Sequence, residues 1–155
     1  MSNVNYLIPK KKHPTFIPGL EPVGVMPAAM VEVPLLGYVT AGLPVDLNED
    51  RETVSIPANM MRKNTYALKV RGDSMIEEQI RDGDVIIVQK RETAANGESV
   101  VAMINGEQVT LKKFYVEADG IRLQPANSDM EPIYLRNEEV QILGIVTGIL
   151  RMSDN

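Results

Sequence analysis

Apolar and polar residues alternate along much of the chain after residue 53, which predicts a series of short β-strands. The alternation is clearest at residues 65–71, where Tyr66, Leu68 and Val70 fall on one face of an extended chain. Residues 85–88 are apolar at every position, as in strands that are buried on both faces. The expected strands are residues 54–57, 65–71, 85–88, 98–104, 107–116, 121–125 and 140–150. A helical turn is expected at residues 59–61 and a short helix at residues 75–79.

Turn residues separate these strands at short intervals. Asn105-Gly106 predicts a two-residue hairpin turn, because both residues tolerate positive φ. Asp119-Gly120 predicts a second hairpin, and the Asp-Gly-Asp sequence at residues 82–84 predicts a tight turn. Many short strands joined by such turns are typical of a mostly β fold, here a curled, partly barrel-like sheet.

The first 34 residues differ in composition from the rest. They hold six of the ten prolines, at positions 9, 14, 18, 22, 27 and 34. Each proline interrupts a helix, so we expect residues 1–34 to form an extended N-terminal arm or linker without a helix-turn-helix. Residues 35–155 are expected to form one domain. Residues 33–44 cross this boundary. The stretch 33–44 is apolar and bounded by Pro and Gly, which predicts a short strand or an extended loop.

Composition narrows the possible chemistry. The 155 residues are 44% apolar, enough for a single core, and they contain no Cys, which excludes disulfides and thiol catalysis. The net charge of −5 is poorly suited to binding nucleic acid, whose phosphates attract cationic proteins. No apolar run is long enough to span a membrane, and the N-terminus lacks the apolar core of a signal peptide. We therefore expect a cytoplasmic protein.

A serine and a lysine are the candidate catalytic residues. Ser74 lies in the sequence Arg-Gly-Asp-Ser-Met at the end of the strand 65–71, and a serine nucleophile needs a neighbouring base. The single histidine, His13, lies in the Pro-rich arm, so lysine is the remaining candidate base. A lysine acts as a base near neutral pH only when burial lowers its pKa. Lys112 and Lys113 both lie in an apolar strand, and spacing alone does not choose between them.

Other interpretations of the same residues are structural. Ser74 and Glu77 have the spacing of a capping box, in which the serine only caps a helical turn. Lys112 is equally compatible with an ordinary exposed lysine. Asp73, together with the aspartates of the 82–84 turn, is better explained by turn chemistry than by metal binding. No metal and no cofactor are expected.

Several segments, in order along the chain, carry a resemblance to a known family. They are Val-Thr-Ala-Gly-Leu-Pro (39–44), Ala-Leu-Lys-Val-Arg-Gly-Asp-Ser-Met (67–75), Asp-Gly-Asp-Val-Ile-Ile-Val (82–88), Glu-Gln-Val-Thr-Leu-Lys-Lys-Phe (107–114) and Leu-Gln-Pro-Ala-Asn-Ser (123–128). Residues 35–150 thereby resemble the self-cleaving domain of the LexA repressor family, which is shared with UmuD-type polymerase subunits. The resemblance implies that the domain includes residues 35–44 as a cleavage-site loop, with scission between Ala41 and Gly42. It implies Ser74 as nucleophile and Lys112, the residue after Val-Thr-Leu, as general base.

The resemblance also implies an oxyanion supported by backbone groups near Ser74, at Asp73 and Met75. It implies a fold like that of LexA and the signal peptidases, a homodimer formed through the C-terminal domain, and a RecA filament on single-stranded DNA as co-protease. The strand 140–150 is a candidate for the dimer contact, although a core strand explains it equally well. The expected function is that of a self-cleaving repressor component in the SOS response.

Three alternatives remain at this point. The first is a UmuD-like accessory subunit of an error-prone polymerase, activated by the same cleavage. The second is a binding module without catalysis, and the third is a peptidase that processes other proteins. A chain without a helix-turn-helix is not expected to bind DNA directly.

Overall fold

The computed structural model describes residues 29–39 and 52–151. Within them, nine strands form one sheet in the order β2-β1-β3-β4-β9-β5-β6-β7-β8. The strands are β1 (Met30–Val39), β2 (Glu52–Pro57), β3 (Thr65–Val70), β4 (Val85–Gln89), β5 (Ser99–Ile104), β6 (Gln108–Glu117), β7 (Gly120–Gln124), β8 (Ile133–Leu135) and β9 (Val140–Leu150). Three short 3-10 helices accompany them: η1 (Ala58–Met60), η2 (Ile76–Glu78) and η3 (Asn137–Glu139). The expectation of a mostly β fold with a curled sheet is confirmed.

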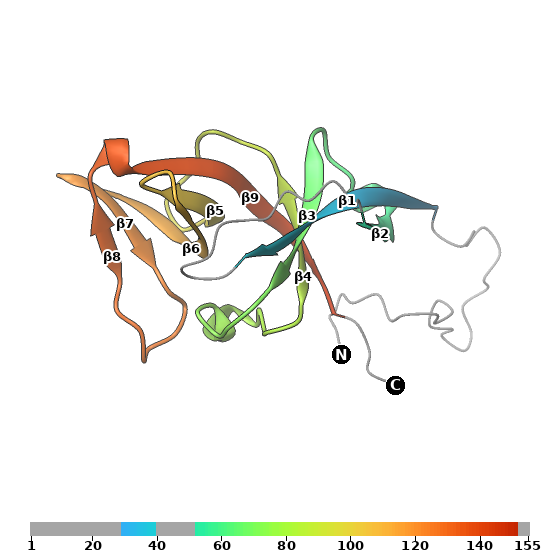
Figure 1. Ribbon diagram of the computed structural model, residues 1–155, viewed down its shortest axis with the longest axis horizontal. Helices are drawn as coiled ribbons and strands as arrows, with labels where there is room; N and C mark the ends of the chain where they lie inside the picture. The colour runs from blue at the N-terminus through green and yellow to red at the C-terminus, as the bar shows by residue number, and fades with distance from the viewer. Residues whose placement is uncertain (1–28, 40–51, 152–155) are drawn as a thin grey trace, which may run out of the picture.

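The long strand β9 joins the two halves of the sheet, as Figure 1 shows. It pairs with β4 in one half and with β5 in the other. Gly144 lets β9 pass close to β4, because a Cβ atom there would lie 2.4 Å from Val88 Cγ1 and 2.7 Å from the Gln89 carbonyl oxygen. Both edges of β9 are thus used within the chain, which favours the interpretation of residues 140–150 as a core strand.

The expected strands agree with the observed ones to within a few residues. The strand expected at 54–57 is the edge strand β2, and the helical turns expected at 59–61 and 75–79 are the 3-10 helices η1 and η2. Asn105 and Gly106 have φ angles of 53° and 71°, as the hairpin prediction required. The turn is not a plain two-residue loop, however, because Ile104 pairs with Gln108 and leaves Glu107 as an extra residue. The short strand β8 was not expected.

Strand β1 begins before the expected start of the domain. The boundary between residues 34 and 35 falls inside β1, which pairs antiparallel with β2 and parallel with β3. Pro34 is accommodated because pairing with β3 begins only at the next residue, Leu35. The pairing then shifts by one residue between Leu35 and Tyr38, where Gly37 has a φ of 133°.

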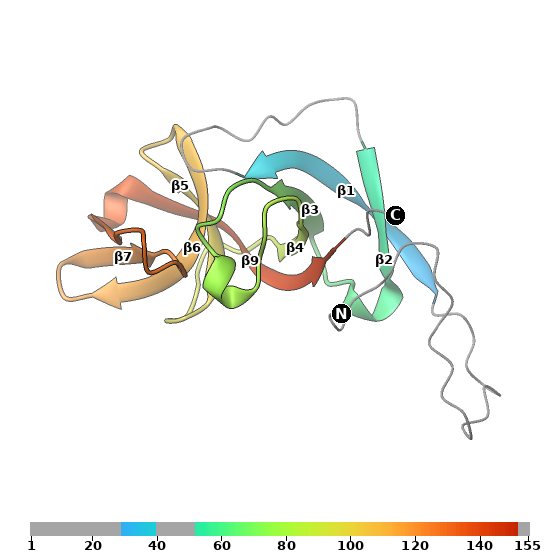
Figure 2. The same cartoon turned by 90° about the horizontal axis from the view of Figure 1, so that it is seen from below.

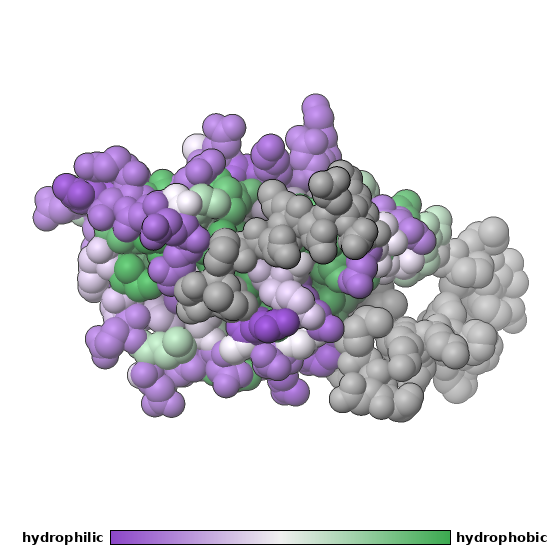
Figure 3. All heavy atoms as spheres, viewed as in Figure 1, coloured by the Kyte–Doolittle hydropathy of each residue, from purple (hydrophilic) through white to green (hydrophobic). Residues whose placement is uncertain are grey.

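Buried side chains form a core on both faces of the sheet. All four apolar residues at positions 85–88 of β4 are buried, as expected for a strand covered on both faces. The part of the core nearest the candidate site contains Leu68, Val70, Met75, Val109 and Leu111. Figure 2 shows how the curl of the sheet carries η2 (light green) close to β6. Figure 3, seen from the same side as Figure 1, shows apolar side chains in small separate groups among hydrophilic ones. No helix within residues 29–39 and 52–151 has the length and apolar character needed to cross a membrane.

Candidate active site

Ser74 lies in a turn that follows β3 and is tied to the neighbouring Asp-Gly-Asp turn. Gly72 has a φ of 90°, a conformation that favours glycine, and its N–H donates to Asp82 Oδ1 at 2.8 Å. The N–H of Val70 donates to the Asp84 carbonyl oxygen, also at 2.8 Å. The two turns therefore form one rigid unit that presents Ser74 half-exposed at its surface.

The hydroxyl of Ser74 reaches across to β6. Its Oγ donates to the Leu111 carbonyl oxygen at 3.3 Å. The helix η2 has Met75, not Ser74, at its N-cap and no side-chain capping bond, so the capping-box interpretation is wrong. Met75 is only 1% exposed and anchors the turn in the core. Glu77, the other residue of the supposed box, instead accepts a hydrogen bond from the N–H of Ser128 at 2.7 Å.

Lys112 is buried in β6, with 3% of its surface exposed. Its Nζ donates to Thr110 Oγ1 at 2.6 Å and to the Leu111 carbonyl oxygen at 3.3 Å. No carboxylate pairs with it within residues 29–39 and 52–151. Burial lowers the pKa of Lys112 from 10.5 to about 8. Thus a substantial fraction of its amine is uncharged at mildly alkaline pH.

The neighbouring lysine has a different environment. The side chain of Lys113 is 25% exposed, and its Nζ lies 3.8 Å from a carboxylate oxygen of Glu78. The Lys113 amine thus lies near the surface and next to a negative charge, unlike the buried amine of Lys112. Of the two lysines that spacing could not separate, Lys112 is therefore the one in an environment suited to a base.

Ser74 and Lys112 meet at a single backbone oxygen. Each donates to the Leu111 carbonyl oxygen at 3.3 Å, so Ser74 Oγ and Lys112 Nζ are at most twice that distance apart. The two side chains share this acceptor, and no direct hydrogen bond joins them in the described part of the chain. Catalytic hydrogen bonds are often long without substrate and shorten when the reacting group arrives.

Three backbone N–H groups around Ser74 are candidate oxyanion donors. The N–H groups of Asp73, Ser74 and Met75 have no acceptor among the residues that the structure describes. Unpaired backbone N–H groups beside a nucleophile are suited to hold the oxyanion that forms during acyl transfer. The expected roles of Asp73 and Met75 are compatible with this arrangement.

The expected cleavage site, Ala41 and Gly42, lies outside the described residues. The chain leaves the described region at Val39, whose carbonyl oxygen accepts a hydrogen bond from the N–H of Arg71 at 3.2 Å. The guanidinium of Arg71 also stacks on the Tyr38 ring, with its carbon 3.7 Å from the ring centroid. The end of β1 is thus held beside the turn that carries Ser74.

Two residues of the site were not expected from the sequence. Thr110 lies two residues before Lys112 in the expected strand 107–116, but its role as the hydrogen-bonding partner of the amine was not foreseen. Asn127 lies in one of the segments that carry the family resemblance, and its Nδ2 donates to the Asp73 carbonyl oxygen at 2.8 Å. Nothing in its sequence neighbourhood indicated that it would reach a residue 54 positions earlier.

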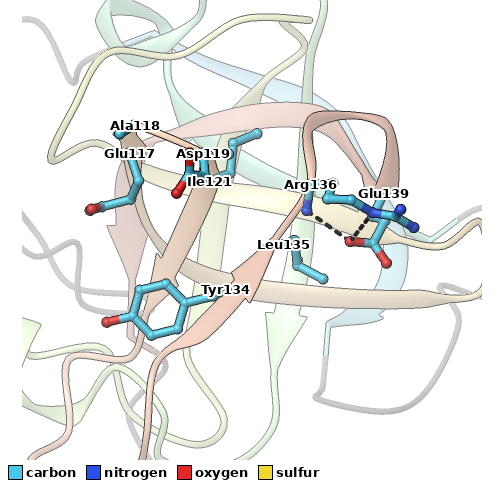
Figure 4. A pocket seen from close by; sticks show the side chains of 9 residues that line it. Glu117, Ala118, Asp119, Ile121, Tyr134, Leu135, Arg136 and Glu139 are labelled. Atoms are coloured by element: carbon cyan, nitrogen blue, oxygen red, sulfur yellow. Dashed lines mark hydrogen bonds and ion pairs between the residues drawn. The ribbon is translucent and has the colours of Figure 1, made fainter.

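A separate hollow lies between the β6–β7 turn and the β8–η3 segment (Figure 4). Its lining contains Glu117, Asp119, Tyr134, Arg136 and Glu139 but no serine, lysine or histidine. The N–H of Arg136 is bonded to Glu139 Oε1 at 2.7 Å. This hollow therefore lacks the groups for serine-lysine chemistry. The described residues also contain no cluster of three or more potential metal-binding side chains.

Comparison with known proteins places these observations in a family. Residues 34–147 match the family model described as Peptidase S24-like. The chain is 48% identical to the LexA repressor of Syntrophobacter fumaroxidans over 122 residues, which cover 78% of this chain and 59% of that protein. It is 46% identical to the LexA repressor of Clostridioides difficile over 125 residues, covering 79% and 59%. It is 40% identical to the LexA repressor of Bacillus cytotoxicus over 146 residues, covering 92% and 70%. The chain spans about three fifths of the length of the first two relatives.

Proposed function

This chain belongs to the LexA-like, Peptidase S24-like family of serine peptidases, and we propose that it cuts its own backbone between Ala41 and Gly42. Ser74 is the nucleophile and Lys112 the general base. The observation that carries this proposal is that the Lys112 amine is buried, has no carboxylate partner among the described residues, and donates to the same carbonyl oxygen as the Ser74 hydroxyl. A buried, unpaired lysine costs stability, and its lowered pKa is what a serine nucleophile requires of its base.

The reaction is an intramolecular acyl transfer. Ser74 Oγ attacks the carbonyl carbon of Ala41 while its proton passes to the uncharged Lys112 Nζ. The backbone N–H groups at Ser74 and its neighbours hold the oxyanion of the tetrahedral intermediate. The bond between Ala41 carbon and Gly42 nitrogen then breaks, and the Lys112 ammonium returns its proton to the leaving amine. Water hydrolyses the resulting ester, which restores the serine and leaves a carboxylate on Ala41.

The position of β1 supports an intramolecular substrate. Ala41 is two residues beyond Val39, a distance of at most about 7 Å for an extended chain. Ser74 is three residues beyond Arg71, the hydrogen-bonding partner of Val39, or at most about 11 Å. The Ala41–Gly42 bond and Ser74 are therefore each within a few residues of a hydrogen-bonded pair, Val39 and Arg71. This makes the effective concentration of the substrate high.

We further infer that this chain acts as a LexA-like repressor component and that self-cleavage inactivates it. The names of the relatives support this role and do not favour the alternative of a UmuD-like polymerase subunit. A RecA filament on single-stranded DNA would act as co-protease by favouring the docked cleavage segment, and the chain would act as a homodimer.

The test is to follow cleavage of the purified chain by mass spectrometry between pH 7 and pH 10.5. Since the pKa of Lys112 is about 8, we expect the rate to rise about tenfold from pH 7 to pH 9 and then to level off. Ser74→Ala and Lys112→Met should abolish the cut, whereas Lys113→Met, the matched control, should retain it. Cleavage by either of the first two variants would refute the assignment, as would a rate that keeps rising to pH 10.5.

A further inference from the structure

The carbonyl oxygen of Asp73, directly before the nucleophile, is fixed by two donors. Asn127 Nδ2 donates to it at 2.8 Å, and the N–H of Ile76 donates to it at 3.2 Å. A carbonyl oxygen has two lone pairs, so both are used. The second bond is local to the turn, whereas the first comes from the segment that follows β7.

The orientation of the Asn127 side chain is determined at both ends. Its Oδ1 accepts a hydrogen bond from the N–H of Asp129 at 2.9 Å, while its Nδ2 donates to Asp73. A flipped amide would place its donor against the N–H of Asp129 and its acceptor against the Asp73 carbonyl. The amide therefore has one satisfied orientation, with its donor directed at Asp73.

The segment that carries Asn127 is also attached to η2 independently of this side chain. The N–H of Glu77 donates to the Ala126 carbonyl oxygen at 2.7 Å, and Glu77 Oε2 accepts from the N–H of Ser128 at 2.7 Å. These two bonds flank Asn127 and hold the segment in place without it. The Asn127 amide is thus not needed to dock the segment. Docking therefore does not explain the hydrogen bond between Asn127 and the Asp73 carbonyl oxygen.

We infer that Asn127 is a positioning residue that sets the direction of the oxyanion-binding N–H of Ser74. The peptide bond between Asp73 and Ser74 is planar and trans, so its C=O and N–H point in opposite directions. By holding the carbonyl oxygen, Asn127 fixes the plane of this peptide and directs the Ser74 N–H to the side away from Asn127. That N–H has no acceptor among the described residues. This inference rests on the proposed function, because it assigns the N–H a role in the same self-cleavage.

The experiment compares Asn127→Asp and Asn127→Ala with wild type. Asn127→Asp keeps the shape and the acceptor for Asp129 but has no N–H to offer Asp73. Ser128→Ala is the matched control, since among the described residues Ser128 forms a hydrogen bond through its backbone N–H and none through its side chain. We expect the plateau rate of self-cleavage above pH 9 to fall about 10- to 100-fold in both Asn127 variants, as for a slightly misplaced oxyanion donor. The pH at half-maximal rate should remain that of wild type, because the environment of Lys112 is unchanged.

A second measurement separates positioning from a general loss of structure. In ¹⁵N-labelled protein carrying Ser74→Ala, which cannot cleave, the amide signal of residue 74 should move in the Asn127 variants, while the signals of β9 residues stay in place. An unchanged plateau rate, or an unchanged amide signal at residue 74, would overturn the inference. If wild type does not cleave at all, the proposed function fails, and the amide signal alone decides whether Asn127 sets this peptide.

Discussion

Replacing Lys112 by methionine tests the physical premise of the site without relying on catalysis. The comparison is made in a Ser74→Ala background, so that neither chain can cut itself during measurement. Methionine fills nearly the same volume as the lysine stem but carries no titratable group. The free energy of unfolding of the two chains should then differ in a way that depends on pH.

The magnitude follows from the pKa of Lys112, which burial lowers from 10.5 to about 8. Each pKa unit corresponds to about 1.4 kcal/mol, so the charged amine makes the folded state less stable by about 3 kcal/mol below pH 8. Between pH 8 and pH 10.5 the unfolded chain binds more protons than the folded one, so stability rises with pH in this window. Above it the cost disappears, because the amine is neutral in both states.

The methionine variant lacks this rise. It also loses the hydrogen bond to Thr110, but that loss does not depend on pH and shifts the whole curve by a constant. We therefore expect the chain with Lys112 to gain about 3 kcal/mol relative to the variant between pH 7 and pH 10.5. The slope of the difference, not its absolute value, is the informative quantity.

The assay is urea unfolding at a series of pH values, followed by far-UV circular dichroism. The chain has no Trp, and tyrosine fluorescence changes as tyrosines ionise in the same pH range, so circular dichroism is the better probe. Lys113→Met, at the more exposed neighbouring lysine, serves as the control for replacing a lysine of this strand by methionine. A flat difference for Lys112→Met would show that its amine has an ordinary pKa, and the reasoning about its burial would then be wrong.

Two further substitutions test the framework around the site. Arg151→Ala should lower stability by about 3 kcal/mol, because Asp84, only 2% exposed, accepts two hydrogen bonds of 2.9 Å from that guanidinium and would lose its charge partner. Adding Asp84→Asn should recover part of this loss in thermal unfolding, and no recovery would mean that the buried charge is not the cause. Gly144→Ala should lower the free energy of unfolding in urea by about 1–3 kcal/mol, since its Cβ would lie 2.4 Å from Val88 Cγ1. A decrease below about 0.5 kcal/mol would show that β9 can move away from β4.

Local patterns predicted most of the strands because each is a short alternating or apolar run between turn residues. The buried strand β4 and the Asn105-Gly106 turn are examples, since periodicity and φ preference both act within a few residues. The strand β8 was missed because it has three residues and only β7 as a neighbour. Its existence depends on a partner strand and not on its own pattern.

The candidate site was predictable in its residue types but not in its connections. A serine in a Gly-Asp turn and a lysine in an apolar strand are visible in the sequence, and they indicate a nucleophile and a base. The hydrogen bonds that connect the site run through backbone carbonyl oxygens. Ser74 and Lys112 both donate to the Leu111 carbonyl oxygen, and Asn127 donates to that of Asp73. Every residue has a carbonyl oxygen, so sequence carries no sign of which one will serve as a meeting point.

One extra residue in a hairpin decides which face of the sheet Lys112 lies on. A two-residue turn at Asn105-Gly106 would pair Ile104 with Glu107, and Val100 would then face Leu111. The observed pairing is Ile104 with Gln108, which places Lys112 opposite Val100, a fully buried residue. Because cross-strand partners share a face of the sheet, a shift of one residue exchanges the faces of Lys112 and Lys113. The turn residues were predicted correctly, but the extra Glu107 was not. Val100 and Val101 point to opposite faces of the sheet and are both fully buried, so both faces are apolar here, and spacing alone could not say which lysine would be buried.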